Sequence, residues 1–530
     1  MKNVKILDCT LRDGGRIINC AFPNSQIKDI AYRLADANID IIEVGFLRDA
    51  KSVNYQGNST FFTDVDQMYV AFIDYGMFDF STLKPYDGTS IDGLRIGFTR
   101  KNFENDHEEI LECLAEVKQK GYKLFVQGVN SLGYTDRELL GIVDIVNQIQ
   151  PEGFGIVDTY GAMYMDDVDR LYTIVDHNLD ENIAIDFHSH NNYQLSFAFA
   201  QEIIRLSNGK REVIIDGTLN GMGKCAGNLN TELLVDYLVR KRNYDYDFDA
   251  ILDIIDDHIY NYHLQHQWGY SIPALMGGIY RSHPNNIIYL TEKFRLATKD
   301  IKYIISMIDP DKRMRYDYDN IQRLYQEYNH VKVDDKENLA LLQRILKGKK
   351  ILLLMPGQSI SQYKDEILKK IEAENLFVIT VNFRDETFDK YSELAFWGSQ
   401  KRYEHYTDLR KEVTSLITSN IESDMEDDII VNYDSFVDRT QEYSDNASLM
   451  LMRILQRVGV VSYYVAGFDG FTVNGSYYNK TDFSEERFRS QYESINKGVA
   501  HQLSMFADSL KHPEDIQFVT PSIYTHIFKR

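Results

Sequence analysis

Cysteine, tryptophan and proline are scarce in this chain, which has 4 Cys, 2 Trp and 9 Pro in 530 residues. The cysteines, at positions 9, 20, 113 and 225, show neither CxxC spacing nor a disulfide framework. A zinc knuckle is therefore excluded, and reduced thiols are expected. No run approaches the roughly 18 apolar residues of a membrane span, and the N-terminus has no signal-peptide pattern. We expect a cytoplasmic protein.

Basic residues are also few: the chain has 58 Lys and Arg but 80 Asp and Glu, which gives a formal net charge of −22. This charge repels phosphate backbones, and no stripe of basic residues interleaved with aromatics compensates for it. The sequence thus argues against a nucleic-acid partner and favours a metal or a basic partner. A Walker motif and a full GxGxxG are missing as well, so nucleotide binding has no motif to support it.

What the chain does have is length and apolar content, with 44% hydrophobic residues, enough for two or three domains with full cores. In the first 220 residues, eight β-rich runs alternate with stretches of helical periodicity such as 25–38 and 107–120. This alternation predicts a (β/α)8 TIM barrel, whose active face is formed by the loops after the strands. The predicted strands are 4–11, 39–46, 69–75, 94–99, 123–130, 153–159, 182–190 and 212–219.

Polar side chains fall at the ends of these predicted strands, where the barrel would bring them to one mouth. They are Arg12, Asp13, Glu43, Arg48, Gln127, Asn130, Asp158, His188, His190 and Asn220. Arg12 and Asp13 precede two glycines, and this pair is either an ion pair closing a strand or part of a site that binds metal. His188 and His190 are two residues apart, so on a strand they point to the same side. Asp13 and these two histidines could share one divalent cation.

Beyond the barrel, a glycine-rich segment at 221–228 precedes a helix, and 247–329 has a helical pattern rich in Tyr, Ile and Asp. A third unit opens with a buried strand at 349–355 that ends in a Gly/Ser turn. Its further predicted strands, 376–383, 394–397, 429–431 and 460–466, indicate an open Rossmann-like α/β sheet with any ligand near 356–359 and Asn382. A structural or dimerising domain is the alternative. The predicted domains are 1–245 (barrel), 246–338 (helical extension and linker) and 339–530 (α/β domain).

The segments 7–15 (LDCTLRDGG) and 188–192 (HSHNN) together resemble the DRE-TIM metallolyase (HMGL-like) superfamily. This superfamily includes 4-hydroxy-2-oxovalerate aldolase, hydroxymethylglutaryl-CoA lyase and the isopropylmalate synthases. Segments 41–45, 157–163 and 221–232 support the resemblance, which covers about residues 1–330. Around 268–301 the chain is more similar to the hydroxy-oxovalerate aldolases than to the synthases.

The resemblance implies that Asp13, His188 and His190 bind a divalent metal, with Asn228 near it. It makes Arg12 the cation that stabilises an enolate oxygen. The implied activity is a metal-dependent aldolase that makes or cleaves a C–C bond of a 2-oxo acid, with an aldehyde as the other substrate. Manganese, magnesium, cobalt and zinc all suit one oxygen and two nitrogen ligands.

One departure concerns Arg16, which stands where the hydroxy-oxovalerate aldolases have a histidine base. A guanidinium cannot accept a proton, so another group must act as the base. Candidates are Tyr280, His283, Tyr134 and His107, each of which could equally be a packed side chain. Arg16 could instead bind an anionic group of the substrate. Glu43 and Asp8 are expected to orient Arg12 and the metal ligands, and Cys225 is expected to be a small packing residue.

The sequence leaves three function classes open. The first is the 2-oxo acid aldolase, and the second is an acetyl-CoA-dependent Claisen synthase. The third is a bifunctional protein with a sugar-transferring C-terminal domain, or a binding protein with a relict barrel. The third unit faintly resembles bacterial sialyltransferase-like nucleotide-binding domains, which would suggest surface-polysaccharide or higher-sugar metabolism. A homo-oligomer is expected.

Overall fold

A computed structural model of the chain describes residues 3–47, 67–292, 296, 298–406, 408, 412–438, 446–472, 489 and 491–529. The chain forms two compact units. Unit 1 is Met1–Ile288 with Asp309–Tyr316, and unit 2 is Tyr289–Ile308 with Asp317–Arg530. The division into 1–245, 246–338 and 339–530 stays a prediction.

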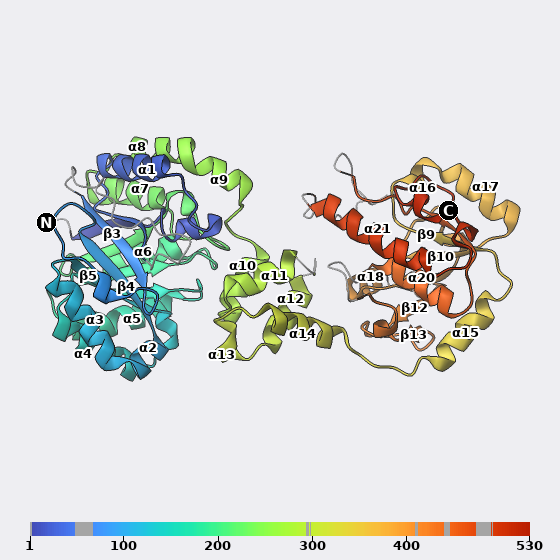
Figure 1. The fold of residues 1–530 in the computed structure, drawn as a ribbon, viewed down its shortest axis with the longest axis horizontal. Helices are drawn as coiled ribbons and strands as arrows, with labels where there is room; N and C mark the ends of the chain where they lie inside the picture. Colours follow the sequence, from blue (N-terminus) through green and yellow to red (C-terminus); the bar gives the residue numbers. More distant parts are fainter. Residues whose placement is uncertain are drawn as a thin grey trace. The chain divides into compact units, whose positions relative to one another are not determined.

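Unit 1 is built on a closed barrel of eight parallel strands, each hydrogen-bonded to its neighbours in sequence order (Figure 1). This confirms the predicted TIM barrel. The strands are β1 Val4–Asp8, β2 Ile41–Phe46, β3 Met68–Asp74, β4 Gly93–Thr99, β5 Lys123–Val129, β6 Gly153–Asp158, β7 Ala184–Ser189 and β8 Val213–Gly217. Nearly all of their residues are buried, because helices cover the outside and side chains fill the inside.

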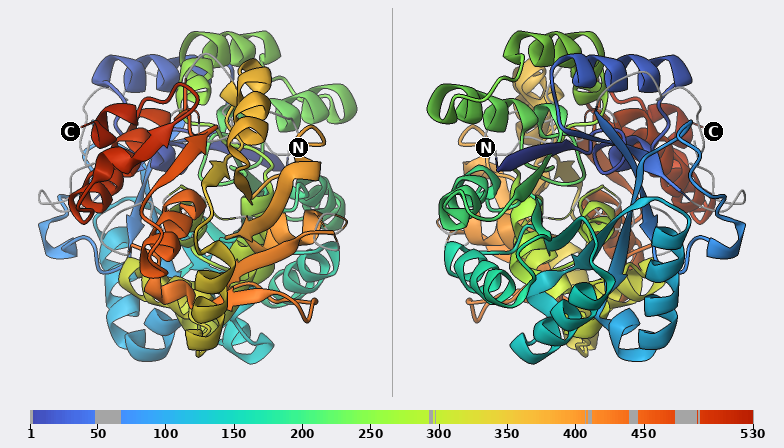
Figure 2. Two further views of the ribbon diagram at one scale, coloured as in Figure 1. Left: turned by 90° about the vertical axis from the view of Figure 1, so that its right-hand side faces the viewer. Right: turned by 90° about the vertical axis from the view of Figure 1, so that its left-hand side faces the viewer.

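Amphipathic helices surround the barrel (Figure 2). They are α1 Asn24–Asp36, α2 Arg100–Asn105, α3 His107–Gln119, α4 Asp136–Ile149, α5 Met165–Asn178, α6 Ser196–Ser207 and α7 Thr231–Arg242. In α4 the apolar positions Leu139, Ile142, Val143 and Val146 face the core, and Thr135 with Glu138 forms a capping box at its start. The capping box fixes where α4 begins, and the apolar face of α4 fixes which side of the helix packs on the strands.

Helices continue after the barrel, as the pattern at 247–329 predicts. They are α8 Phe248–Ile254, α9 Tyr260–Gln265, α10 Ile272–Tyr280, α11 Pro284–Glu292, α12 Thr298–Met307, α13 Pro310–Arg313 and α14 Tyr318–Asn329. Helix α10 packs closely on the loops after β6 and β7. A Cβ on Gly278 would lie 2.9 Å from the ring of Tyr193 and 3.1 Å from the carbonyl of Gly161. This contact brings the segment after α10 to the C-terminal face of the barrel.

Unit 2 contains a seven-stranded parallel sheet in the order β13-β12-β11-β10-β9-β14-β15. Its strands are β9 Ile351–Leu354, β10 Phe377–Val381, β11 Ser392–Trp397, β12 Thr414–Thr418, β13 Ile429–Val431, β14 Tyr463–Ala466 and β15 Ile516–Phe518. The expected Rossmann-like sheet is confirmed, but β12 and β15 are absent from the sequence prediction. Helices of this unit include α15 Lys336–Leu346, α16 Ser359–Gln362, α17 Lys364–Glu374, α18 Gln400–His405, α20 Ala447–Arg457 and α21 Tyr492–Asp508.

The strand order of unit 2 reverses between β9 and β14, the point where open α/β sheets bind ligands. Here the turn after β9 is filled by the protein's own groups. Asp469 accepts hydrogen bonds from Ser359 N at 2.8 Å and Ser359 Oγ at 2.5 Å, and Thr520 contacts the same hydroxyl at 2.9 Å. Asn382 accepts a hydrogen bond from Gly398 N at 2.9 Å. A ligand at 356–359 and Asn382 stays a prediction.

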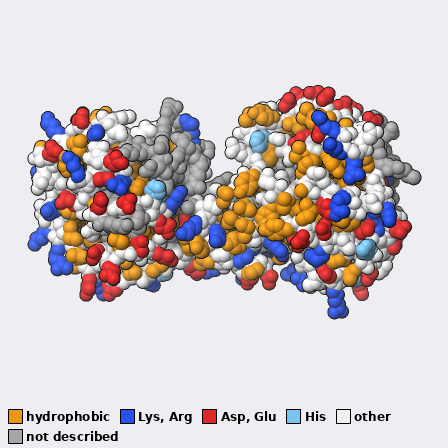
Figure 3. All heavy atoms as spheres, turned by 180° about the vertical axis from the view of Figure 1, so that it is seen from behind, with side chains coloured by type: hydrophobic (Ala, Val, Ile, Leu, Met, Phe, Trp, Pro, Cys, Tyr) orange, Lys and Arg blue, Asp and Glu red, His pale blue; other side chains and the backbone are white. Residues whose placement is uncertain are grey.

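The surface of the described chain carries exposed apolar side chains in several places. Between residues 260 and 318 these include Tyr260, Leu264, Tyr270, Ile272 and Tyr316. On the face drawn in Figure 3, Lys and Arg side chains are interspersed with Asp and Glu. Among the helices that the structure describes, none has the length and apolar character needed to cross a membrane.

Candidate active site

The loop after β1 is pinned so that Arg12 and Asp13 lie over the C-terminal end of the barrel. Asp8 accepts hydrogen bonds from Thr10 N at 3.0 Å and from Thr231 Oγ1 at 2.6 Å. The backbone then turns tightly, with Asp13 N donating to the Cys9 carbonyl at 2.9 Å. Burial raises the pKa of Asp8 to about 6. Asp8 thus holds the loop and does not point at a substrate.

Asp13, His188 and His190 come together, as their positions at the ends of β1 and β7 predict. Asp13 Oδ2 lies 3.6 Å from His190 Nε2 and 3.9 Å from His188 Nε2. One ligand atom from each of the three residues lies within 4.8 Å of the other two. Burial lowers the pKa of both histidines to about 4, so both imidazoles are neutral at pH 7 and can bind metal. The three side chains form a candidate site for one cation.

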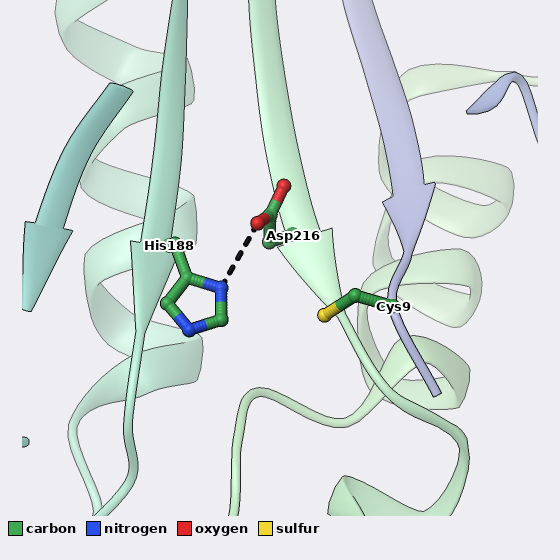
Figure 4. Close-up of side chains that lie close together, drawn as sticks. All are labelled: Cys9, His188 and Asp216. Atoms are coloured by element: carbon green, nitrogen blue, oxygen red, sulfur yellow. Dashed lines mark hydrogen bonds and ion pairs between the residues drawn. The ribbon is translucent and has the colours of Figure 1, made fainter. Parts of the chain in front are cut away.

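The orientation of His188 is set by Asp216 from β8, whose carboxylate lies 2.9 Å from Nδ1 (Figure 4). This contact places the proton on Nδ1 and leaves the lone pair on Nε2, which faces Asp13. Cys9 lies near the same pair, but its thiol donates to the Gly217 carbonyl at 3.3 Å, and burial raises its pKa well above the usual range. Cys9 is therefore a protonated packing group and a poorer metal ligand than Asp13.

Asn228 lies beside the three residues. Its Nδ2 donates to Asp13 Oδ2 at 3.1 Å and to the Met222 carbonyl at 3.0 Å. Its Oδ1 is buried and has no hydrogen-bond partner among the described residues. An unpaired buried acceptor costs free energy, and a cation nearby would remove that cost.

Arg12 is fixed between two carboxylates. Its Nη1 donates to Asp13 Oδ1 at 2.7 Å and its Nε to Glu43 Oε2 at 2.6 Å. The guanidinium carbon stands 4.4 Å from the ring centroid of Phe72. Burial by itself would raise the pKa of Asp13, but the charge of Arg12 beside it lowers the pKa more, and the net pKa is well below the usual range. Asp13 is therefore an ionised carboxylate.

A fully buried ionic layer lies beneath these residues. Arg95 from β4 donates to Glu43 at 3.1 Å and to Asp186 and Asp216 at 2.7 Å each. Together with Asp13 and Arg12, this group contains four buried carboxylates and two buried guanidiniums, namely Asp13, Glu43, Asp186 and Asp216 with Arg12 and Arg95. If all six are ionised, these side chains carry a net charge of −2. Burial raises the pKa of Asp186 to about 7 and also raises that of Asp216. A divalent cation would offset the surplus charge.

A cavity of about 190 Å³ opens above the layer. The predicted residues that line it are Arg12, Asp13, Arg16, Gln127, His188, His190 and His283. Glu43 and Asn228 are buried behind it, each in contact with a lining residue. The predicted residues Asn130, Asp158 and Asn220 are not among the lining residues, and Arg48 lies outside the described residues.

The four candidate bases are spread over the molecule. Tyr280 ends α10, and its ring lies under Arg313 at 5.3 Å, not on the cavity. Tyr134 is buried and donates to the Phe98 carbonyl at 3.2 Å, and His107 is exposed at the start of α3. His283 does line the cavity, and burial lowers its pKa to about 4. Among these four, His283 is the one placed to contact a substrate.

Arg16 also lines the cavity, but its guanidinium forms ion pairs with two carboxylates. Its Nε lies 3.1 Å from Asp13 Oδ1, and its Nη2 lies 3.8 Å from Asp74 Oδ1. The guanidinium carbon is 4.6 Å from the ring centroid of Phe46. Its side chain is 35% exposed, so a substrate could still reach it.

Sequence reasoning missed Arg95, Asp216 and Lys224. Arg95 and Asp216 are single charged residues inside the buried runs GLRIGFT and VIIDG, and such a residue in a core strand is itself a signal. Lys224 lies in the glycine-rich segment 221–228, whose role the sequence left open. The spacing of His188 and His190 on a strand predicts that both point to the same side. The position of Tyr280, by contrast, is set by contacts with a distant segment around Arg313, which the sequence does not reveal.

Residues 94–257 match the HMGL-like family model. A probable 2-isopropylmalate synthase of Methanosarcina mazei is 28% identical over 43% of this chain, and the match spans 44% of that protein, less than half its length. A 4-hydroxy-2-oxovalerate aldolase of Carboxydothermus hydrogenoformans is 25% identical over 57% of this chain and 90% of its own. The solved N-terminal domain of a candidate aldolase from Bacteroides vulgatus is 26% identical over 54% of this chain and 96% of its own, with a TM-score of 0.45. The part of the chain from β4 to α8 is thus similar to the HMGL-like family.

Proposed function

We propose that unit 1 is a divalent-metal-dependent lyase that makes or cleaves the C–C bond next to a 2-oxo acid, of the 4-hydroxy-2-oxo acid aldolase type. The observation that carries the proposal is the approach of Asp13, His188 and His190 to within 4.8 Å of one another beside Arg12. Asp13, His188 and His190 would hold the metal, and the unpartnered Asn228 oxygen and the surplus buried charge fit a cation there. Manganese is the first metal to test, since it accepts both oxygen and imidazole ligands.

A divalent cation bound there would act as a Lewis acid on a 2-oxo acid and stabilise negative charge that develops on its oxygen. Arg12 would donate hydrogen bonds from its guanidinium to the same oxygen, and its two carboxylate partners keep it oriented before the substrate arrives. His188 stays neutral because burial lowers its pKa to about 4, and Asp216 holds its ring in place.

His283 lines the cavity and is placed to donate a hydrogen bond to the aldehyde part of the substrate. Its Nδ1 accepts a hydrogen bond from Asn285 N at 3.1 Å, so in the neutral ring Nε2 carries the proton. Nε2 would donate a hydrogen bond to the aldehyde oxygen as the C–C bond forms, and a water molecule from solvent would supply the proton that this oxygen takes up. In the reverse direction the same hydrogen bond would stabilise the alkoxide after its proton passes to solvent water.

The aldolase-like relative matches along 90% of its length, whereas the synthase relative matches along 44%. This coverage favours the aldolase over the acetyl-CoA-dependent Claisen synthase as a proposal. A synthase would release free thiol from acetyl-CoA in the presence of a 2-oxo acid, and an aldolase would not. A sugar-transferring role for unit 2 rests on the resemblance of the C-terminal α/β domain to sialyltransferase-like domains. A setting in surface-polysaccharide or higher-sugar metabolism rests on the same resemblance.

The metal assignment can be tested on two ligand variants. Asp13→Ala and His190→Ala should each lose most bound cation and nearly all cleavage of 4-hydroxy-2-oxo acids, because two ligands cannot hold the metal. Elemental analysis after dialysis measures the cation, and circular dichroism checks the fold. Asp249→Ala removes an exposed carboxylate of α8 and serves as the control. Full metal content in both ligand variants would refute the assignment.

A further inference from the structure

Lys224 lies in the loop after β8 and lines the same cavity as Arg12 and the two histidines. Its side chain is half-buried. Its Nζ donates to the amide oxygen of Asn285 at 3.3 Å. The loop geometry that places it there depends on Gly221 and Gly227, which both have positive φ. The glycine-rich segment therefore delivers a cation to the cavity.

The other cations at this site are already matched by carboxylates. Arg12 is paired with Asp13 and Glu43, and Arg16 with Asp13 and Asp74. Arg95 is paired with three carboxylates in the layer below. Lys224 forms no ion pair with any residue that the structure describes, and its contact with Asn285 is to a neutral oxygen. An ammonium group has three donors, so two remain for a ligand.

Two other lining residues of the cavity, Arg16 and His283, lie near Lys224. Burial lowers its pKa, and the nearby charge of Arg16 lowers it further. His283 is neutral because of burial and the charges of Lys224 and Arg16, and it presents an N–H at Nε2. Two cations and one neutral donor from three separate loops thus gather at one edge. The charge of Asp13 also acts on Lys224, but no described carboxylate forms an ion pair with it, so an anionic ligand could supply that partner.

We propose that Lys224, with Arg16 beside it, forms a subsite for an anionic oxygen group at the far end of the substrate, while His283 keeps its place at the aldehyde oxygen. The inference rests on the proposed function, in which the metal ligands and Arg12 take the 2-oxo acid. The acceptor aldehyde then carries a phosphate ester or a carboxylate, and Lys224 neutralises it. Uncharged aldehydes leave Lys224 without a counter-ion and are poorer substrates.

The kinetic test compares matched aldehydes with and without the anionic group. Addition of pyruvate to glyceraldehyde 3-phosphate is measured against glyceraldehyde, and addition to succinic semialdehyde against butanal. In Lys224→Met the ratio of kcat/KM for the charged over the uncharged aldehyde should fall about tenfold to a hundredfold, as expected for loss of a charge-assisted hydrogen bond. Lys210→Met removes an exposed lysine from the turn between α6 and β8, at the opposite end of the barrel, and should keep the wild-type ratio. An unchanged ratio in Lys224→Met would overturn the proposal.

A binding test separates this inference from the proposed function. The full chain, stripped of metal with chelator, is titrated calorimetrically with glycerol 3-phosphate, glycerate and glycerol. At least one anion should bind, about tenfold or more weakly in Lys224→Met, and the tighter of the two anions identifies a phosphate or a carboxylate as the natural group. Lys224-dependent binding without turnover of any aldehyde would leave the subsite standing and overturn the aldolase. Turnover without Lys224-dependent anion binding would overturn the subsite and leave the aldolase standing.

Discussion

Arg12 shows how a single side chain can be prepared for its task before any substrate binds. Its donors at Nε and Nη1 are committed to Glu43 and Asp13, and the ring of Phe72 covers the guanidinium at 4.4 Å. The planar fork can satisfy two carboxylates and still present donors to the cavity that it lines. An ammonium group has the same charge but not this geometry.

Replacing Arg12 with lysine therefore separates charge from geometry. We expect Arg12→Lys to retain bound metal, because Asp13 and both histidines are unchanged, and to lose about a hundredfold or more in turnover, as loss of one oxyanion donor does. Steady-state cleavage of a 4-hydroxy-2-oxo acid and elemental analysis of the same preparation check the two parts. Wild-type turnover would mean that Arg12 has a structural role.

The low pKa of the two histidines predicts how metal affinity depends on pH. Burial lowers the pKa of His188 and His190 to about 4, so neither is protonated between pH 8 and 5. Protons compete with metal for the ligands, so affinity should be nearly constant over this range and should fall as the pH approaches 4. Competition with a metal-sensitive dye measures it. Loss of affinity that begins near pH 6.5, the value of an ordinary histidine, would contradict this account.

At the scale of elements, Gly155 on β6 leaves space inside the barrel for the side chain of Gln127 on the neighbouring strand β5. Gln127 on β5 donates to Asp186 at 2.6 Å, and its side chain lies directly against Gly155 on β6. A Cβ on Gly155 would come 2.1 Å from Gln127 Oε1 and 2.6 Å from its Cδ, so the amide would have to shift and strain its hydrogen bond to Asp186. The glycine thus maintains the position of Gln127 in the barrel.

Gly155→Ala should consequently lower the free energy of unfolding by about 1–3 kcal/mol, because overpacking in a core forces side chains off their rotamers. Urea denaturation followed by circular dichroism measures the change. Gly141→Ala on α4 is the matched control, since a Cβ there meets no atom within 4 Å. It should be neutral or stabilise the helix by up to about 1 kcal/mol. Equal stability of the two variants would contradict the close packing of Gln127.

The strands of the barrel could be predicted because each is a continuous apolar run followed by polar residues and a helix with a clear apolar face. In unit 2, β15 (IQF) contains an exposed Gln and β12 (TSLIT) mixes hydroxyl with apolar residues, so neither is a continuous apolar run like β13 (IIV), which was predicted. The meeting of Asp13, His188 and His190 was predictable from the spacing of the histidines and from the strand ends, whereas Asn228 was expected only from the family resemblance. The Arg95 layer and Lys224 were not, because their partners lie on strands and loops far away in the sequence.

At the scale of the whole molecule, two compact units have separate cores, and the candidate metal site belongs to unit 1. The buried carboxylates of Asp13, Glu43, Asp186 and Asp216 outnumber the buried guanidiniums of Arg12 and Arg95. Metal binding should therefore stabilise unit 1 directly, since a ligand that binds the folded state alone adds to its stability.

We expect saturating Mn²⁺ to slow hydrogen exchange in peptides that contain the ends of β1, β7 and β8, and to leave peptides of β9 to β15 unchanged. At a hundred times the dissociation constant, the stabilisation should be about 2.7 kcal/mol. Mass-spectrometric hydrogen exchange with and without chelator measures the effect, and Asp13→Ala should abolish it. Equal protection in unit 2 would show that the metal binds elsewhere.

The central claim, that unit 1 performs metal-dependent chemistry on a 2-oxo acid, is tested most directly by proton exchange at the methyl group of pyruvate. In deuterium oxide, without aldehyde, the wild-type chain with Mn²⁺ should replace the methyl protons of pyruvate at a rate well above buffer, as followed by proton nuclear magnetic resonance. Exchange should stop with chelator and in Asp13→Ala, and should continue in Asp249→Ala. Exchange at the buffer rate in the metal-loaded wild type, or full exchange in Asp13→Ala, would contradict the account.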